Sequence, residues 1–136
     1  MHIRNTHARE VARPPSEVFA ALEAVGTEND TVWPAPSIPF ERTPGQLRVM
    51  ETKERHGIIR ATLVELEPDR SLVWRADQPF IKGTHGFEIT ETDAGCHVTH
   101  VLDARLAWWF VPIWMFKVGA VHDRILERLL ERLETA

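Results

Sequence analysis

The chain has 136 residues, of which 43% are hydrophobic and 26% charged, and its formal net charge is −4. These values are typical of one globular domain, and the lack of a basic excess argues against a nucleic-acid partner. The single cysteine, Cys96, cannot form an intrachain disulfide, and the N-terminal residues lack the apolar core of a signal peptide. We therefore expect a cytoplasmic protein with one domain over residues 1–136.

The N-terminal part predicts a strand, a helix and a second short helix. Residues 3–11 form the expected first strand, and the Pro-Pro-Ser-Glu sequence at 14–17 is typical of a helix start. Gly26 marks the end of this helix, because glycine is favoured just after a helix. A further short helix is expected at 27–33, and Pro34 ends it.

The region from about Ile38 to Leu106 has the pattern of antiparallel strands. Turn sequences such as Pro44-Gly45 and the Asp-Ala-Gly at 93–95 recur at strand-length intervals, and such short connections join antiparallel strands. The expected strands are 38–43, 46–55, 58–67, 71–77, 80–91 and 96–106. Together with 3–11 they predict a sheet of about seven strands.

The last predicted element is a long helix that begins between Trp108 and Pro112 and ends near Glu134. Its apolar positions recur at steps of three and four residues, at Val118, His122, Ile125, Leu129 and Leu133. The apolar run at 106–121, which leads into this helix, has sixteen residues and contains Lys117. A membrane span needs about 20 apolar residues, so we expect no membrane span.

These elements predict an α+β fold in which a curved antiparallel sheet grips the long C-terminal helix, with two short helices between strands 1 and 2. Three segments carry a resemblance to a known family: VARPPSEVFAAL, ATLVELEPDRSLVWRAD and GTHGFEITETDAGCHVTHVLDAR. They resemble the polyketide cyclase/dehydrase and lipid-transport superfamily, whose START-like (SRPBCC) domains share a helix-grip fold. The resemblance implies one such domain over 1–136, with a hydrophobic pocket between sheet and helix.

The resemblance also implies a class of function. A small hydrophobic molecule, such as a lipid or an aromatic, polyketide-like metabolite, is expected to bind in the pocket without a cofactor. In some members of the superfamily the pocket is a carrier site, and in others it is an active site for cyclisation or dehydration. The first hypothesis is therefore a carrier, and the alternative is a cyclase/dehydrase-type enzyme that uses His85, His100 or His122 as its acid or base.

The last predicted hairpin indicates which polar side chains face the pocket. With a turn at 94–95, His85 pairs with Ala104, and His85 and His100 share the apolar face of the hairpin. In this register the two histidines lie roughly 13 Å apart along the strands, too far to share one ion. His97 and His100 lie on opposite faces, so we expect no metal site.

Six residues are expected to contact the ligand: Trp74, His85, Phe87, His100, Met115 and His122. Trp74 and Phe87 belong to the concave face of the sheet, and His122 lies on the apolar stripe of the last helix. Asp123 lies about 100° around the helix from His122, so the two do not form a ready catalytic pair. Arg60 is expected on the outside as a solvated charge.

The apolar start of the last helix predicts an interface. Because a helix that is apolar on all sides cannot bury every side, some of its tryptophans must be exposed. We expect Trp108, Trp109 and Trp114 to form this interface. Its partner is another protein, a membrane surface or a second copy of the chain in a homodimer, which makes an interaction module the third functional hypothesis.

Overall fold

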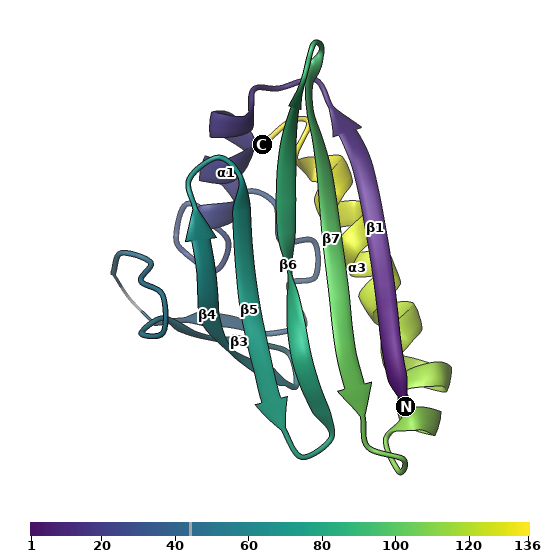
Figure 1. Ribbon diagram of the computed structural model, residues 1–136. Coiled ribbons are helices and arrows are strands. Elements are labelled where there is room, and N and C mark those ends of the chain that lie inside the picture. The colour runs from purple at the N-terminus through teal and green to yellow at the C-terminus, as the bar shows by residue number, and fades with distance from the viewer. Residues whose placement is uncertain (44) are drawn as a thin grey trace.

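The computed structural model, which describes residues 1–43 and 45–136, has an antiparallel sheet that wraps around a C-terminal helix (Figure 1). Within these residues the sheet has seven strands in the order β1-β7-β6-β5-β4-β3-β2. The strands are β1 (His2–Val11), β2 (Phe40–Arg42), β3 (Lys53–His56), β4 (Ile59–Glu67), β5 (Ser71–Gln78), β6 (Ile81–Thr92) and β7 (Gly95–Leu106). The first strand thus pairs with the last, and the predicted sheet is confirmed.

The helices lie on one side of this sheet. Helix α1 (Pro15–Glu23) follows β1 along the chain. The C-terminal helical segment comprises α2 (Val111–Ile113), the π-helical turn η1 (Trp114–Val118) and α3 (Gly119–Arg132). In Figure 1, α3 lies behind β7 and β1. This arrangement is the predicted α+β helix-grip fold. Over residues 1–43 and 45–136, none of the helices is long and apolar enough to cross a membrane.

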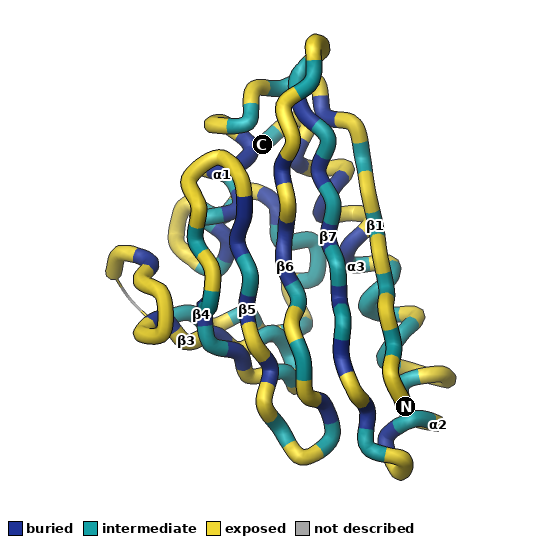
Figure 2. The backbone as a smooth tube through the Cα atoms, viewed as in Figure 1, coloured by how far each residue is buried: buried dark blue, intermediate teal, exposed yellow. Residues whose placement is uncertain are grey.

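Side chains alternate between the inner and the outer face of the strands, which is a property of extended backbone. Figure 2 shows this alternation along β7. The inward side chains of β7 are buried, namely Cys96, Val98, His100, Leu102, Ala104 and Leu106, whereas those between them are partly or fully exposed. His100 therefore lies on the inner, apolar face, where the sequence places it.

The register of the β6–β7 hairpin differs by two residues from the predicted one. The loop consists of residues 93–94, so His85 pairs with Leu102 instead of with the predicted partner two residues further on. Gly95 belongs to β7, where it pairs with Thr92, and it lies close to β1: a Cβ atom on Gly95 would be 2.2 Å from the carbonyl oxygen of Val11. A shift of two residues keeps every side chain on its predicted face.

The second predicted helix, at 27–33, does not form, and this stretch makes turns and bends instead. The carboxylate of Asp30 accepts hydrogen bonds from the backbone N–H groups of Val32 and Trp33, at 2.9 and 3.0 Å. Such local bonds compete with helical ones. Of the two helices expected between the first two strands, α1 alone is present in the described part of the chain.

The predicted strand 46–55 is also shorter than expected. Strand β3 begins only at Lys53, because residues 49–51 form a turn in which Met50 has a positive φ of 68°. The predicted turn at Pro44-Gly45 includes Pro44, which lies outside the described residues. Residues 45–52, which precede β3, belong to none of the strands.

The buried apolar side chains form two clusters. One cluster joins α1 and the end of α3 to the sheet and includes Leu22, Leu63 and Leu130. The other lies near the start of the C-terminal helical segment and includes Ile81 and Phe110. Leu22 and Ile81 also line the cavity described next, so the cavity lies between the two clusters.

Candidate ligand-binding cavity

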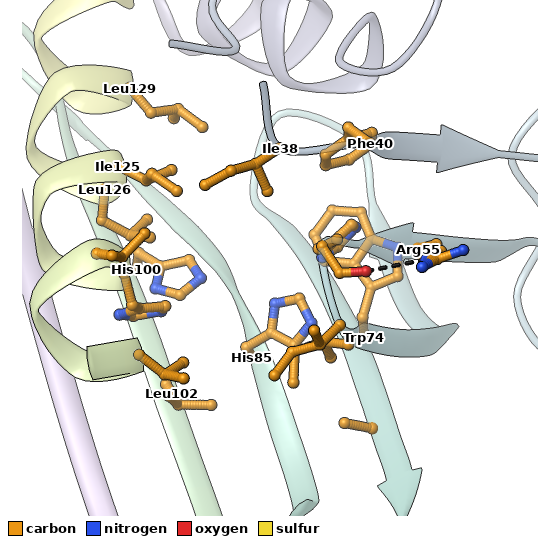
Figure 3. A pocket seen from close by; sticks show the side chains of 18 of the residues that line it. Ile38, Phe40, Arg55, Trp74, His85, His100, Leu102, Ile125, Leu126 and Leu129 are labelled. Carbon is orange, nitrogen blue, oxygen red and sulfur yellow. Dashed lines mark hydrogen bonds between the residues drawn. The ribbon is translucent and has the colours of Figure 1, made fainter. Parts of the chain in front are cut away.

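A cavity of about 510 Å³ lies between the concave face of the sheet and α3 (Figure 3). Its walls come from α1, the segment 33–42, strands β3 to β7 and the C-terminal helical segment, and they are mostly apolar. The volume is within the range of small-molecule sites, about 300–1,000 Å³. Apolar lining residues include Leu22, Val25, Ile38, Phe40, Ile59, Leu102, Val121, Ile125, Leu126 and Leu129.

Five of the six residues expected to contact a ligand line this cavity, namely Trp74, His85, Phe87, His100 and His122. The structure corrects the placement of Met115, whose side chain points away from the cavity and is 63% exposed. The cause is the π-helical turn η1, which contains one residue more than an α-helical turn. As a result Trp114 and Val118 face the cavity and Met115 faces solvent.

Five of the described histidines form a row across the inside of the fold. This histidine row runs from β3 through β6, β7 and α3 to β1 and consists of His56, His85, His100, His122 and His7. Successive ring centroids are 5.0, 5.9, 5.6 and 6.1 Å apart. The separation predicted for His85 and His100, roughly 13 Å, is too long because the hairpin register differs by two residues.

The inner histidines of the row are neutral near pH 7. Burial lowers the pKa of His85 and of His100 well below the usual value, and the neighbouring histidines lower it further. Burial also lowers the pKa of His122, although Asp123 acts in the opposite direction. A neutral imidazole has one N–H donor and one acceptor nitrogen, so each ring can donate to or accept from a bound molecule.

Glu54 and His56 form a hydrogen-bonded pair at one end of the row. The Oε2 atom of Glu54 lies 2.6 Å from Nε2 of His56, and Oε1 of Glu54 accepts a 2.6 Å hydrogen bond from Nε of Arg42. The side chain of Glu54 is completely buried and that of Arg42 is 4% exposed. His56 also stacks on Phe40 at a centroid distance of 4.3 Å. These contacts place an oriented imidazole in the cavity wall.

Four ring nitrogens of cavity-lining side chains have no hydrogen-bond partner within residues 1–43 and 45–136. They are Nε1 of Trp74, Nε2 of His85, Nδ1 of His100 and Nδ1 of His122. The rings of Trp74 and His85 are stacked 5.8 Å apart, so these atoms belong to one region of the wall. A buried polar group without a partner costs about 1–3 kcal/mol, and a bound molecule can remove this cost by supplying the partner.

The predicted interface residues divide into two groups. Trp108 is 84% exposed and Trp109 is 47% exposed. Trp114 instead lines the cavity, with its ring 5.6 Å from that of His122. Five large apolar side chains within residues 108–116 are exposed, and we refer to them as the apolar patch: Trp108, Trp109, Ile113, Met115 and Phe116.

The sequence pattern does not reveal Glu54, His56 or His7 as site residues. Strand β3 reads Lys-Glu-Arg-His, so every position is polar and no apolar face marks the inward side. Acidic residues are almost always exposed, which argues against an inward Glu54. One local signal exists: Glu54 and His56 are two residues apart and therefore share a face of the strand. Arg60 is exposed, as predicted.

The sheet, the gripped helix and the cavity between them define a protein of the helix-grip class. The model of the family described as polyketide cyclase / dehydrase and lipid transport matches residues 2–136. The chain therefore belongs to this family, as the resemblance of its sequence implies. None of the curated proteins matches the chain.

Several solved structures share the fold at low sequence identity. The Mll3558 protein from Rhizobium loti is 18% identical with a TM-score of 0.68, and the match covers 98% of this chain and 96% of that chain. Protein MLL2253 from Mesorhizobium loti is 13% identical with a TM-score of 0.69, and the match covers 97% of each chain. The Aha1 dimer from Colwellia psychrerythraea is 13% identical with a TM-score of 0.65, covering 98% of this chain and 97% of that chain.

Proposed function

We propose that the chain binds a small, mostly apolar molecule with one or two polar groups in the cavity between the sheet and α3. The observation that carries the proposal is the combination of apolar walls with four ring nitrogens that lack a partner in the described part of the chain. Apolar walls favour binding because they remove hydrophobic surface from water, and the polar atoms orient the molecule. No cofactor is needed for this function.

The shape of the polar region favours an aromatic ligand with a carbonyl or hydroxyl group. Trp74 and His85 are stacked, and Phe87 meets His100 at a centroid distance of 4.8 Å, so flat rings form much of this wall. Aromatic rings interact favourably with other rings in stacked or edge-to-face arrangements. A carbonyl oxygen can accept from the indole N–H of Trp74, and a hydroxyl can donate to a histidine nitrogen.

Native mass spectrometry of the full chain, purified without denaturation, tests this proposal. We expect a co-purifying small molecule at up to one equivalent, and its mass and fragments give the ligand class. Protein that carries no such mass should still bind the apolar fluorescent probe anilinonaphthalene sulfonate. An empty protein that also fails to bind the probe would contradict the proposal.

A second candidate function is acid–base catalysis on the bound molecule, and the contact between Glu54 and His56 favours it. A histidine held by a carboxylate can take up or release a proton during a reaction. His85 and His100 have no carboxylate within hydrogen-bonding distance among the described residues, so they are weaker candidates than the sequence suggests. In this candidate His56 is the acid or base, and His85 lies 5.0 Å from it across the cavity wall.

Conversion of the identified ligand by the purified protein separates this candidate from a carrier. If His56 is the acid or base, His56→Gln should lower kcat by about 10²- to 10⁴-fold and leave the affinity for the ligand nearly unchanged. The matched variant His85→Gln should instead weaken binding of the ligand, because it replaces a ring nitrogen of the cavity wall. A wild-type protein that leaves the ligand unchanged would remove the enzyme candidate.

We also propose that a second copy of the chain covers the apolar patch. Trp108 and Phe116 are more than 80% exposed, at 84% and 82%, and large exposed apolar patches usually mark interaction surfaces. The structurally similar Aha1 protein is described as a dimer. A two-fold contact would let the same patch on both copies cover each other.

A cytoplasmic location is part of the same proposal. Cys96 is the only cysteine of the chain, and its side chain is buried in the core. Secreted domains often carry disulfides, whereas thiols stay reduced in the cytosol. Fractionation of the host cells with an antibody against the full chain would locate the protein.

A further inference from the structure

Beside the cavity, a cluster of side chains has the composition of a metal site. His7 on β1 and His122 and Asp123 on α3 each offer a ligand atom, and these three atoms lie within 4.8 Å of one another. His7 is the last member of the histidine row, so the cluster lies at the opposite end of the row from Glu54. We propose that His7, His122 and Asp123 bind a divalent transition-metal ion, with zinc as the expected ion.

The distances fit one coordination sphere. Nε2 of His7 is 3.0 Å from Oδ1 of Asp123, and Nδ1 of His122 is 3.6 Å from the same oxygen. Two ligand atoms that each lie about 2.1 Å from a zinc ion are about 3.0 Å apart at a right angle and about 3.4 Å apart at a tetrahedral angle. An ion between the three atoms would draw Nδ1 of His122 closer to Oδ1 of Asp123.

Two further side chains hold the ligands in the orientation that a metal needs. Oε1 of Glu127, one turn further along α3, lies 2.5 Å from Nδ1 of His7, so Glu127 can hold a proton on Nδ1 while Nε2, which faces Asp123, binds the ion in place of a proton. Nδ2 of Asn5 donates a 3.0 Å hydrogen bond to Oδ1 of Asp123. A carboxylate behind a histidine ligand is a common feature of zinc sites, because it fixes the tautomer and the ring orientation.

The third ligand atom is free for an ion. Nδ1 of His122 is buried and has no hydrogen-bond partner among the described residues, although Oδ1 of Asp123 lies 3.6 Å from it. Asp123 is half exposed, with 48% of its side chain accessible, whereas the side chains of His7 and His122 are 11% and 19% exposed. The site is thus closed by the two imidazoles and open to solvent at the carboxylate, from which side an ion can enter.

The donor set indicates the class of metal. Two imidazole nitrogens and one carboxylate oxygen suit zinc and similar transition metals, whereas calcium and magnesium prefer oxygen ligands alone. Three protein ligands leave a fourth position for water or another ligand. Because His122 also lines the cavity, the ion would lie directly behind the cavity wall.

The chain provides matched controls for this site. His2 contacts Asp103, and His97 contacts Glu10, so each is a histidine–carboxylate pair on the outside of the sheet. Within residues 1–43 and 45–136, no other group of three histidine, cysteine, aspartate or glutamate side chains comes as close together as the proposed ligands do. A variant of His97 therefore removes a similar pair without touching the proposed site.

Titration calorimetry of the tag-free full chain with zinc, after removal of bound metal with a chelator, tests the proposal. We expect one equivalent of zinc to bind the wild type and the His97→Ala variant with equal affinity. His7→Ala and Asp123→Asn should weaken binding by about 100-fold or more. Glu127→Gln, which keeps all three ligands, should weaken it by about 10- to 100-fold.

Circular dichroism and thermal unfolding of each metal-free variant show whether it is folded, and Asp123→Asn and Glu127→Gln keep the size of the native side chains. Zinc should also raise the melting temperature of the wild type, but not that of Asp123→Asn. Equal zinc affinity in the wild type and in both ligand variants would overturn the proposal. Zinc binding that survives in His7→Ala and is lost in His85→Gln would also overturn the proposal, because the ion would then lie in the cavity.

Discussion

The ring of His85 on β6 lies 5.9 Å from that of His100 on β7, and the two residues are diagonal neighbours on the inner face of the sheet. Both rings belong to the cavity wall, where the surroundings are mostly apolar. A positive charge on either ring is unfavourable there, and a charge on one makes a charge on the other still less favourable. Protonation of these two histidines therefore works against the folded state.

The free energy of unfolding should fall as the pH is lowered below 6.5. Burial lowers the pKa of His85 and His100 in the folded protein, so the unfolded chain binds more protons between the usual value of 6.5 and the lowered pKa. Each histidine contributes up to about 1.4 kcal/mol per pH unit in this window. Urea unfolding at a series of pH values measures the slope. His100→Leu should reduce it, the control His97→Leu should not, and an equal slope in all three proteins would contradict the prediction.

Replacing Glu54 with glutamine should destabilise the protein strongly. Glu54→Gln removes the negative charge between Arg42 and His56, and it leaves the nearly buried guanidinium of Arg42 without its counter-charge. Breaking a buried ion pair in this way costs about 3–5 kcal/mol. Denaturant unfolding gives the value, with Glu65→Gln on the exposed side of β4 as the control, for which we expect a change within about 0.5 kcal/mol. A loss below 1 kcal/mol for Glu54→Gln would show that the pair is not buried in solution.

A larger side chain at position 121 should block the cavity. Val121 lines the cavity from α3, so the indole of Val121→Trp would occupy space that a ligand needs. We expect affinity for anilinonaphthalene sulfonate to fall at least about tenfold, which corresponds to about 1.4 kcal/mol. Fluorescence titration measures this affinity. The control Arg124→Trp, at an exposed position of the same helix, should bind as the wild type does, and equal binding by all three would place the probe elsewhere.

The apolar patch should govern self-association. Trp108→Ser combined with Phe116→Ser removes the two most exposed side chains of the patch and should weaken dimer formation at least about tenfold, because exposed aromatic anchors dominate such interfaces. Sedimentation equilibrium measures the association constant. The control Arg128→Ser changes an exposed side chain outside the patch and should have no effect. A wild type that stays monomeric but binds phospholipid vesicles would indicate a membrane surface as the partner.

The general fold could be predicted because its determinants are local. Turn sequences, alternation along strands and the apolar stripe of the last helix each lie within one segment, and they predict the antiparallel sheet and the gripped helix. The register of the β6–β7 hairpin depends on a contact between segments. Gly95 pairs with Thr92 and lies too close to the carbonyl oxygen of Val11 for any other residue, and this packing against β1 is not visible in the turn sequence.

The candidate site could be predicted only in part, for the same reason. Trp74, His85 and His100 follow from the alternation along their own strands. The histidine row takes one residue from each of five elements, and no local pattern carries the distances between elements. The placement of Met115 fails because a constant helical period cannot anticipate the extra residue in η1.

That extra residue has a consequence for the whole C-terminal helical segment. Deleting one residue from 114–118 would leave an ordinary α-helical turn and keep the residues before it in phase with His122, whereas an α-helical turn that kept all five residues would rotate them by about 100°. That rotation would turn Met115 toward the cavity, where a constant helical period places it. Gly119 permits the wide turn, since a Cβ atom there would lie 2.9 Å from the carbonyl oxygen of Trp114. The turn thus acts as a phase shift between two helical faces, so loss of its extra residue should be tolerated better than an insertion, which would shift the phase again.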